Sequence, residues 1–166
     1  MGDASPIKQH AYRCSLDKRQ LMKSEVEYLV EHGLAKPSHS PWSFPCLLTP
    51  KSDGTPHFCT DFRKANAVTE AESFPLPQID DCVDSIGPAR YISKLDLLKE
   101  YFQVPLTTRA SEISAFVTPD HFMQYIVMAF GLKNALATLQ RLMHNVLSDV
   151  PQCNVYLDDV VVYSSD

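Results

Sequence analysis

The chain lacks long apolar runs and paired cysteine motifs. Among its 166 residues no apolar run approaches the roughly 18 residues of a membrane-spanning helix, and residues 1–6 lack the apolar stretch of a secretory signal. Its five cysteines are odd in number and widely spaced, without a C-x-x-C pair, which argues against a disulfide framework or a zinc site. We therefore expect an intracellular protein, cytoplasmic or nuclear, with reduced thiols and no membrane partner.

An excess of positive charge is also missing, because the formal net charge is −5 at pH 7. This argues against a simple basic surface for nucleic acids. The charge is unevenly placed: residues 1–66 contain nine Lys and Arg against seven Asp and Glu, whereas residues 67–166 contain six against thirteen. The asymmetry fits phosphate contacts in the first part and cation ligands in the second. A solvated surface with arbitrary charge explains it equally well.

The hydrophobic content of 45% is enough for one globular domain with a sizeable core. Apolar periodicity predicts helices at 16–33, capped by Ser15, at 75–86 and at 135–147. Strands are predicted at 46–49, 57–62, 91–97, 113–117 and 122–128. The inward positions expected on the helices are Met22, Val26, Leu29 and Val30, then Ile79, Val83 and Ile86, then Leu139, Leu142, Met143, Val146 and Leu147. Because helices and strands do not strictly alternate, an α+β fold is favoured.

The most informative segment is Tyr156-Leu157-Asp158-Asp159, where two adjacent carboxylates separate two apolar runs. Neighbouring residues of a strand point to opposite faces, so both aspartates serve one site only if the backbone turns there. Clustered carboxylates are the ligands that hard cations such as Mg²⁺ require. The alternative is that the pair is only the polar tip of a β-hairpin.

Asp96 is a lone carboxylate in the apolar segment 93–98. An unpaired buried aspartate is costly, so Asp96 either caps a short helix that follows or shares a cation with Asp158 and Asp159. Three carboxylates that hold two divalent ions about 4 Å apart form an arrangement suited to phosphoryl or nucleotidyl transfer.

These carboxylates stand among motifs that resemble the reverse transcriptase domain of gypsy-type LTR retrotransposons and related retroviral-like Pol polyproteins. The resemblance covers about residue 6 to the C-terminus, and the motifs follow the family's order. They are PWS at 41–43, KSDG at 51–54, CTDFRKAN at 59–66, FPLPQIDD at 74–81, SKLDL at 93–97, FGLKNA at 130–135, QRLM at 140–143 and YLDDV at 156–160.

The resemblance implies a single partial domain of fingers and palm. Fingers are expected at roughly 6–90 and 110–128, and palm at roughly 91–109 and 129–166. The chain ends just after the Asp-Asp hairpin, so the rest of the palm, the thumb, and the ribonuclease H and integrase regions of such polyproteins are expected to be absent from it. Ribonuclease H activity would belong to the polyprotein only.

By the same resemblance Asp96, Asp158 and Asp159 match the catalytic metal ligands, with two Mg²⁺ as cofactors and Mn²⁺ as a substitute. Lys51 and Arg63 match contacts to the incoming triphosphate or the template, and guanidinium groups suit phosphate oxygens. Ordinary surface charge is the alternative for Lys51.

Four further residues match substrate-binding positions. Tyr101 matches the aromatic residue under the nucleotide sugar, and its alternative is a core aromatic. Gly131 and Gln140 match positions near the nucleotide and template strand, with a loop turn and a helix-surface amide as alternatives. Tyr156 matches the tyrosine that touches the primer end, or it packs beside Tyr163.

The chain also departs from the family pattern. Glu100 stands where a glycine usually precedes the aromatic residue, and His57 stands at a basic position. The leading hypothesis is an RNA-directed DNA polymerase fragment that extends a primer on an RNA or DNA template with deoxynucleoside triphosphates. The alternative is an inactive retroelement remnant that at most binds nucleic acid or a partner.

Overall fold

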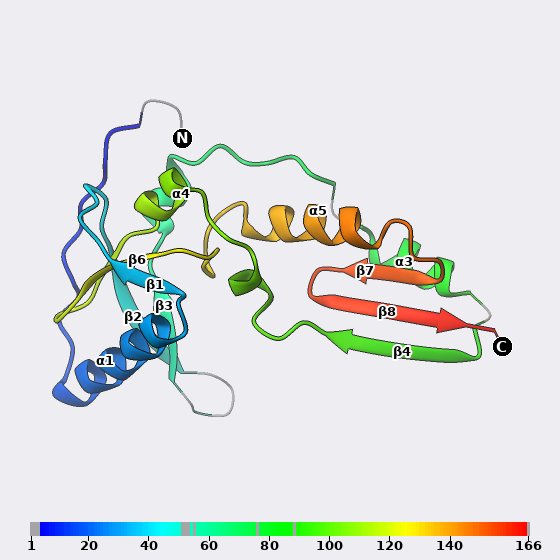
Figure 1. Cartoon of the computed structure of the whole chain (residues 1–166), viewed down its shortest axis with the longest axis horizontal. Helices are drawn as coiled ribbons and strands as arrows, with labels where there is room; N and C mark the ends of the chain where they lie inside the picture. Colours follow the sequence, from blue (N-terminus) through cyan, green and yellow to red (C-terminus); the bar gives the residue numbers. More distant parts are fainter. Residues whose placement is uncertain (1–3, 51–53, 55, 76, 88, 166) are drawn as a thin grey trace. The chain divides into compact units, whose positions relative to one another are not determined.

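The computed structural model describes residues 4–50, 54, 56–75, 77–87 and 89–165. It divides the chain into two compact units, each built from two separate stretches of sequence (Figure 1). Unit 1 comprises Met1–Glu70 and Tyr101–Lys133, and unit 2 comprises Ala71–Glu100 and Asn134–Asp166. None of the helices in this described part combines the length and the apolar character needed to cross a membrane.

Unit 1 contains a five-stranded sheet of order β1-β6-β5-β2-β3. Its strands are β1 Ala35–Pro37, β2 Phe44–Pro50, β3 Pro56–Thr60, β5 Phe116–Val117 and β6 Phe122–Tyr125, and its helices are α1 Leu16–Glu31, α2 Arg63–Ala67 and α4 Thr108–Ile113. Strands β2 and β5 pair in parallel, and the other neighbouring strands are antiparallel. The sheet therefore joins the N-terminal stretch of the unit to its second stretch.

Aromatic rings form the centre of the unit 1 core. Phe44 and Phe116 are fully buried, and the ring of Phe44 meets that of Phe62 edge to face at 5.5 Å between centroids. Helix α1 begins after Ser15, whose side chain accepts a hydrogen bond from the Lys18 amide, as the sequence predicts.

The inward face of α1 is narrower than predicted. Met22, Val26 and Leu29 are buried, but Val30 is 44% exposed. A helix buries only the stripe that faces its partner, and Val30 follows Leu29 by about 100° around the helix axis. Its place on the predicted inward face was therefore wrong.

Unit 2 is a three-stranded antiparallel sheet with two helices. Its elements are α3 Ile79–Ile86, β4 Tyr91–Asp96, α5 Ala135–Leu147, β7 Cys153–Tyr156 and β8 Asp159–Ser164. The strand order is β4-β8-β7, and both helices contact β7 (Figure 1). The central strand β8 therefore joins the first stretch of this unit to the second.

Several predictions for helix burial in unit 2 were wrong. Ile79 and Val83 of α3 are each 59% exposed, and on α5 Leu142 and Val146 are 40% and 63% exposed. Leu139 is buried on α5, as predicted. Apolar spacing predicts the apolar side of a helix, but burial requires a partner surface. Here both helices pack chiefly against one strand, β7, at an edge of the sheet.

The unit boundaries differ from the ranges that the resemblance implies for fingers and palm. Residues 71–90 belong to the same unit as the carboxylate hairpin, and residues 101–109 belong to unit 1. Helix α4 was not predicted, and Ile113 ends that helix and does not begin a strand.

Candidate active site

The Asp-Asp segment is a tight β-hairpin, as the sequence predicts. Tyr156 at the end of β7 pairs with Asp159 at the start of β8, so only Leu157 and Asp158 form the turn. Leu157 has φ 59°, in the left-handed region that non-glycine residues rarely adopt. The turn places Asp158 at the tip and Asp159 on the central strand.

Asp96 lies opposite this hairpin. It is the last residue of β4 and is the cross-strand partner of Asp159. Directly paired residues of antiparallel strands project from the same face, and the Leu97 amide also donates to the Asp158 carbonyl at 3.2 Å. The structure therefore brings Asp96, Asp158 and Asp159 to one end of the sheet.

A lysine already contacts this carboxylate group. Lys94 shares the face of Asp96, two residues along β4, and its Nζ lies 2.8 Å from Asp159 Oδ2. The hydrogen bond and the charge of Asp159 raise the pKa of Lys94. Within the described residues no three metal-ligating side chains already converge on one point. The three carboxylates nevertheless offer the oxygen donors that Mg²⁺ and Mn²⁺ prefer.

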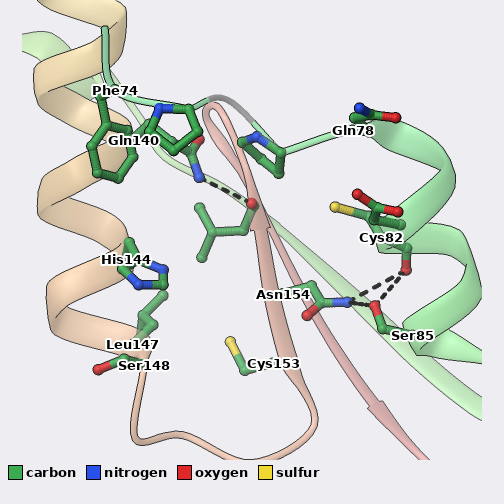
Figure 2. Close-up of a pocket in the computed structure, with 14 residues that line it drawn as sticks. Phe74, Gln78, Cys82, Ser85, Gln140, His144, Leu147, Ser148, Cys153 and Asn154 are labelled. Carbon is green, nitrogen blue, oxygen red and sulfur yellow. Dashed lines mark hydrogen bonds between the residues drawn. The ribbon is translucent and has the colours of Figure 1, made fainter.

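Asp96 and Asp159 lie on the sheet face opposite to Val160, because Val160 follows Asp159 on β8 and neighbouring strand residues point to opposite faces. Val160 is 6% exposed and pairs with Val155. Val155 lines a cavity of about 770 Å³ together with residues of α3, α5 and the segment that precedes α3. Figure 2 shows this cavity, with Cys82 of α3, His144 of α5 and Cys153 of β7 around it.

Gln140 of α5 is attached to the hairpin. It is 4% exposed, its Nε2 donates to the Val155 carbonyl at 3.2 Å, and its Oε1 accepts from the Leu157 amide at 2.9 Å. Sequence resemblance placed Gln140 near the nucleotide, with a helix-surface amide as the alternative. Its burial excludes the surface alternative. Tyr156, the primer-side candidate, is half-buried in β7.

Arg63 belongs to a separate polar group in unit 1. Its Nε and one terminal nitrogen donate to the Asp61 carboxylate at 2.9 and 2.7 Å, and Tyr12 Oη donates to the same carboxylate at 2.8 Å. Asp61 is buried, and the Arg63 and Tyr12 hydrogen bonds hold its pKa well below the usual range. The Arg63 side chain is 85% exposed, so the outer edge of its guanidinium faces solvent.

Arg63 borders a cavity of about 440 Å³ that Gly131 also lines. Gly131 has φ 87°, a conformation that favours glycine. A Cβ there would meet Phe62 and the Thr60 carbonyl only at 3.7 Å, so the backbone angle, not space, selects glycine. The structure therefore brings Arg63 and Gly131 together.

Tyr101 packs in an aromatic cluster around Phe130. The Tyr101 and Phe130 rings meet edge to face at 4.6 Å, and the rings of His57 and Phe102 lie 6.1 and 5.7 Å from that of Phe130. Tyr101, the candidate for the position under the nucleotide sugar, and His57, one of the departures from the family pattern, therefore belong to the same aromatic cluster. Lys51, the other triphosphate candidate, lies outside the described residues.

Glu100, the second departure, is 9% exposed and begins the 3-10 helix η1 Glu100–Gln103. The left-handed residue is its neighbour Lys99, with φ 51°. The left-handed backbone conformation therefore lies one residue before Glu100, the position where the family pattern has a glycine.

Sequence reasoning missed three residues that organise these groups: Tyr12, Asp61 and Lys94. No pattern of spacing connects Tyr12 to Asp61, because 49 residues separate them. The short separation of Asp61 from Arg63, and of Lys94 from Asp96, could have indicated those pairs.

The comparisons with known proteins agree with these motifs. Residues 49–166 match the family model described as reverse transcriptase (RNA-dependent DNA polymerase). This chain belongs to that family.

Similar curated proteins include Pol polyproteins of retrotransposons from Drosophila melanogaster. The polyprotein of transposon 297 is 31% identical over 97% of this chain, and that of transposon gypsy is 30% identical over 99%. The chain spans only 16% and 17% of their lengths. An RNA-directed DNA polymerase homolog from Oenothera berteroana is 40% identical over 64% of the chain and 76% of its own length.

Solved structures of the foamy viral protease-reverse transcriptase share the fold. The native prototype foamy virus protein gives a TM-score of 0.84 at 22% identity, covering 99% of this chain and 22% of that one. A complex with double-stranded DNA gives 0.88 at 20% identity, covering 99% of this chain and 29% of that one.

Proposed function

We propose that this chain carries the catalytic carboxylates of an RNA-directed DNA polymerase that adds deoxynucleotides to a primer 3′-hydroxyl. The single observation behind this is that the backbone places Asp96, Asp158 and Asp159 at the same end of the unit 2 sheet, in a chain of the reverse transcriptase family. Unit 2 would then correspond to the palm and unit 1 to the fingers.

The carboxylates would hold two Mg²⁺ ions, or Mn²⁺ as a substitute. Such ions, when bound, neutralise charge on the phosphate oxygens and on the attacking and leaving oxygens. Asp96 and Asp159 would supply oxygen donors from neighbouring strands, and Asp158 would supply one from the turn between β7 and β8. The ammonium group of Lys94 forms an ion pair with Asp159. This pair supports the proposal that a positive ion can bind at the Asp159 carboxylate.

In the proposed reaction the 3′-hydroxyl oxygen bonds to the α-phosphorus while the bond to the β-phosphate bridging oxygen breaks, releasing pyrophosphate. The hydroxyl proton passes to solvent or to a nearby carboxylate. Arg63 would contact the triphosphate or the template through its exposed edge, and Lys51 would add charge. Tyr101 would lie beneath the sugar, Gly131 near the template, and Tyr156 at the primer end.

The nucleic-acid partner is proposed from the solved relatives. The foamy viral protein has been solved with double-stranded DNA and with an RNA/DNA hybrid. We infer that a template-primer duplex is the macromolecular substrate of this chain, alongside deoxynucleoside triphosphates.

A non-catalytic, nucleic-acid-binding remnant is the second candidate. Glu100 favours it, because a carboxylate replaces the glycine of the family pattern immediately before Tyr101. The two candidates differ in whether the carboxylates are needed for any activity beyond binding.

The test is extension of a labelled DNA primer on an RNA template in Mg²⁺ or Mn²⁺. The variant Asp158→Asn is compared with Asp149→Asn, which changes an exposed aspartate in the turn after α5. Loss of about 100-fold or more in Asp158→Asn alone is expected, because it removes charge at the reacting centre. Duplex binding without extension by the folded wild type would support the remnant instead.

A further inference from the structure

A buried amide connects helix α5 to the turn of the carboxylate hairpin. Both polar atoms of the Gln140 side-chain amide form hydrogen bonds. Nε2 donates to the Val155 carbonyl at 3.2 Å, and Oε1 accepts from the Leu157 amide at 2.9 Å. Figure 2 shows the first of these bonds, from α5 to β7. Because only 4% of Gln140 is exposed, its amide has little surface left for a substrate.

The hairpin needs such a partner at this point. Leu157 is the first residue of a two-residue turn and has φ 59°, a conformation that costs energy in a residue with a Cβ. β7 is an edge strand, so its outward main-chain groups require partners other than a neighbouring strand. Buried main-chain groups without partners are costly, and Gln140 satisfies one on each side of Tyr156.

Only a short stretch of backbone separates the Gln140 hydrogen bonds from the carboxylate residues. Leu157 precedes Asp158 directly, and the Asp158 carbonyl accepts from the Leu97 amide, next to Asp96. A change in the Leu157 conformation would therefore move the Asp158 carboxylate and disturb the hydrogen bond between the Leu97 amide and the Asp158 carbonyl.

We propose that Gln140 is a positioning residue that fixes the left-handed turn at Leu157 and thereby holds Asp158 and Asp159 in register with Asp96. It acts through the hairpin backbone and does not touch the nucleotide. The structural part stands on the hydrogen bonds above, and the kinetic part rests on the proposed polymerase function.

The structural part is tested by hydrogen exchange of single amides in the whole chain. In Gln140→Leu the Leu157 amide should exchange about tenfold faster, the loss expected for one hydrogen bond, while the Tyr163 amide, which donates to the Gln152 carbonyl, keeps its protection. Gln140→Glu retains an acceptor for Leu157 and should preserve most of the protection. Unchanged Leu157 exchange in Gln140→Leu would overturn the proposal.

Gln124→Leu is the matched control, because Gln124 is another buried glutamine, 7% exposed, that bonds Ser38 and Ser111 within unit 1. It should leave Leu157 exchange unchanged. Equal acceleration at Leu157 in both variants would show general destabilisation and would overturn the specific role.

The kinetic part is read from primer extension at saturating template-primer. Gln140→Leu should lower kcat about tenfold or more with little change in the KM for nucleotide, and Gln140→Glu should recover part of kcat. A raised KM with unchanged kcat would mean a direct nucleotide contact and would overturn the positioning role. If the wild type extends no primer, the proposed function fails, and the Leu157 exchange still decides the structural claim.

Discussion

The Nζ atom of Lys94 lies 2.8 Å from Oδ2 of Asp159, so an ammonium group is bound to one of the three carboxylates proposed to hold divalent ions. The two side chains come from neighbouring strands, β4 and β8, that pair along six residues. A metal ion at Asp159 would therefore compete with Lys94.

Removing that competitor should strengthen cation binding. In Lys94→Met we expect Mn²⁺ to bind about two- to fivefold more tightly, the range that corresponds to the loss of a partly exposed ion pair. The affinity is measured by titration with Mn²⁺, followed by electron paramagnetic resonance. Lys23→Met is the control, because Lys23 forms an exposed pair with Glu27 on α1. Weaker or unchanged Mn²⁺ binding in Lys94→Met would count against competition.

Asp61 should contribute to stability in a way that depends on pH. Its pKa is depressed in the folded state by Arg63 and Tyr12, so its contribution is complete above the unfolded pKa of about 4 and declines as pH falls below that value. Asp61→Asn should lower the free energy of unfolding at pH 7 by about 1–3 kcal/mol. The deficit relative to wild type should shrink on acidification.

Urea unfolding between pH 7 and pH 3 measures this difference. Asp120→Asn is the comparison, since Asp120 pairs with Arg19 on the surface and its pKa is also lowered. That exposed pair should contribute less to stability than the buried Asp61 carboxylate does, because water and salt screen it. A deficit for Asp61→Asn that is equally small, or that grows at low pH, would contradict the Arg63–Asp61–Tyr12 arrangement.

Arg63 should affect nucleotide or template binding through its planar shape. Arg63→Lys keeps one charge but cannot donate two parallel bonds to Asp61 while facing outward. We expect the KM for nucleotide or template-primer to rise about tenfold, and Arg19→Lys to leave both values unchanged. Unaltered kinetics in Arg63→Lys would make Arg63 a structural partner of Asp61 only.

Cys46 should be the least reactive thiol among the five cysteines. It is 2% exposed, and burial raises its pKa to about 12, so almost no thiolate forms at neutral pH. Alkylation of the native protein at pH 7.5, followed by peptide mass spectrometry, should modify partly exposed Cys14 well before Cys46. Equal rates without denaturant would show that the unit 1 core opens more readily than the structure implies.

The hairpin was predictable because Tyr156 to Asp159 combines apolar flanks with a local turn, and local chemistry determines a two-residue connection. Helix α5 was predicted with its observed bounds, since its apolar residues recur at helical spacing. Helix α4 has only six residues and little apolar periodicity. The only local signal of this helix in the sequence is therefore its N-cap residue, Thr107. The roles of Tyr12 and Gln140 depend on contacts across 49 and 17 residues, which no local pattern encodes.

The central claim is that Asp96, Asp158 and Asp159 form one divalent-cation site. It is tested most directly by replacing the ion with Fe²⁺ and cleaving the backbone with ascorbate and peroxide, because hydroxyl radicals formed at the ion cut the nearby chain. Cleavage near both residue 96 and residues 158–159, suppressed by excess Mg²⁺ and lost in Asp158→Asn, is the predicted result. Cleavage confined to other segments, or unaffected by Asp158→Asn, would contradict the account.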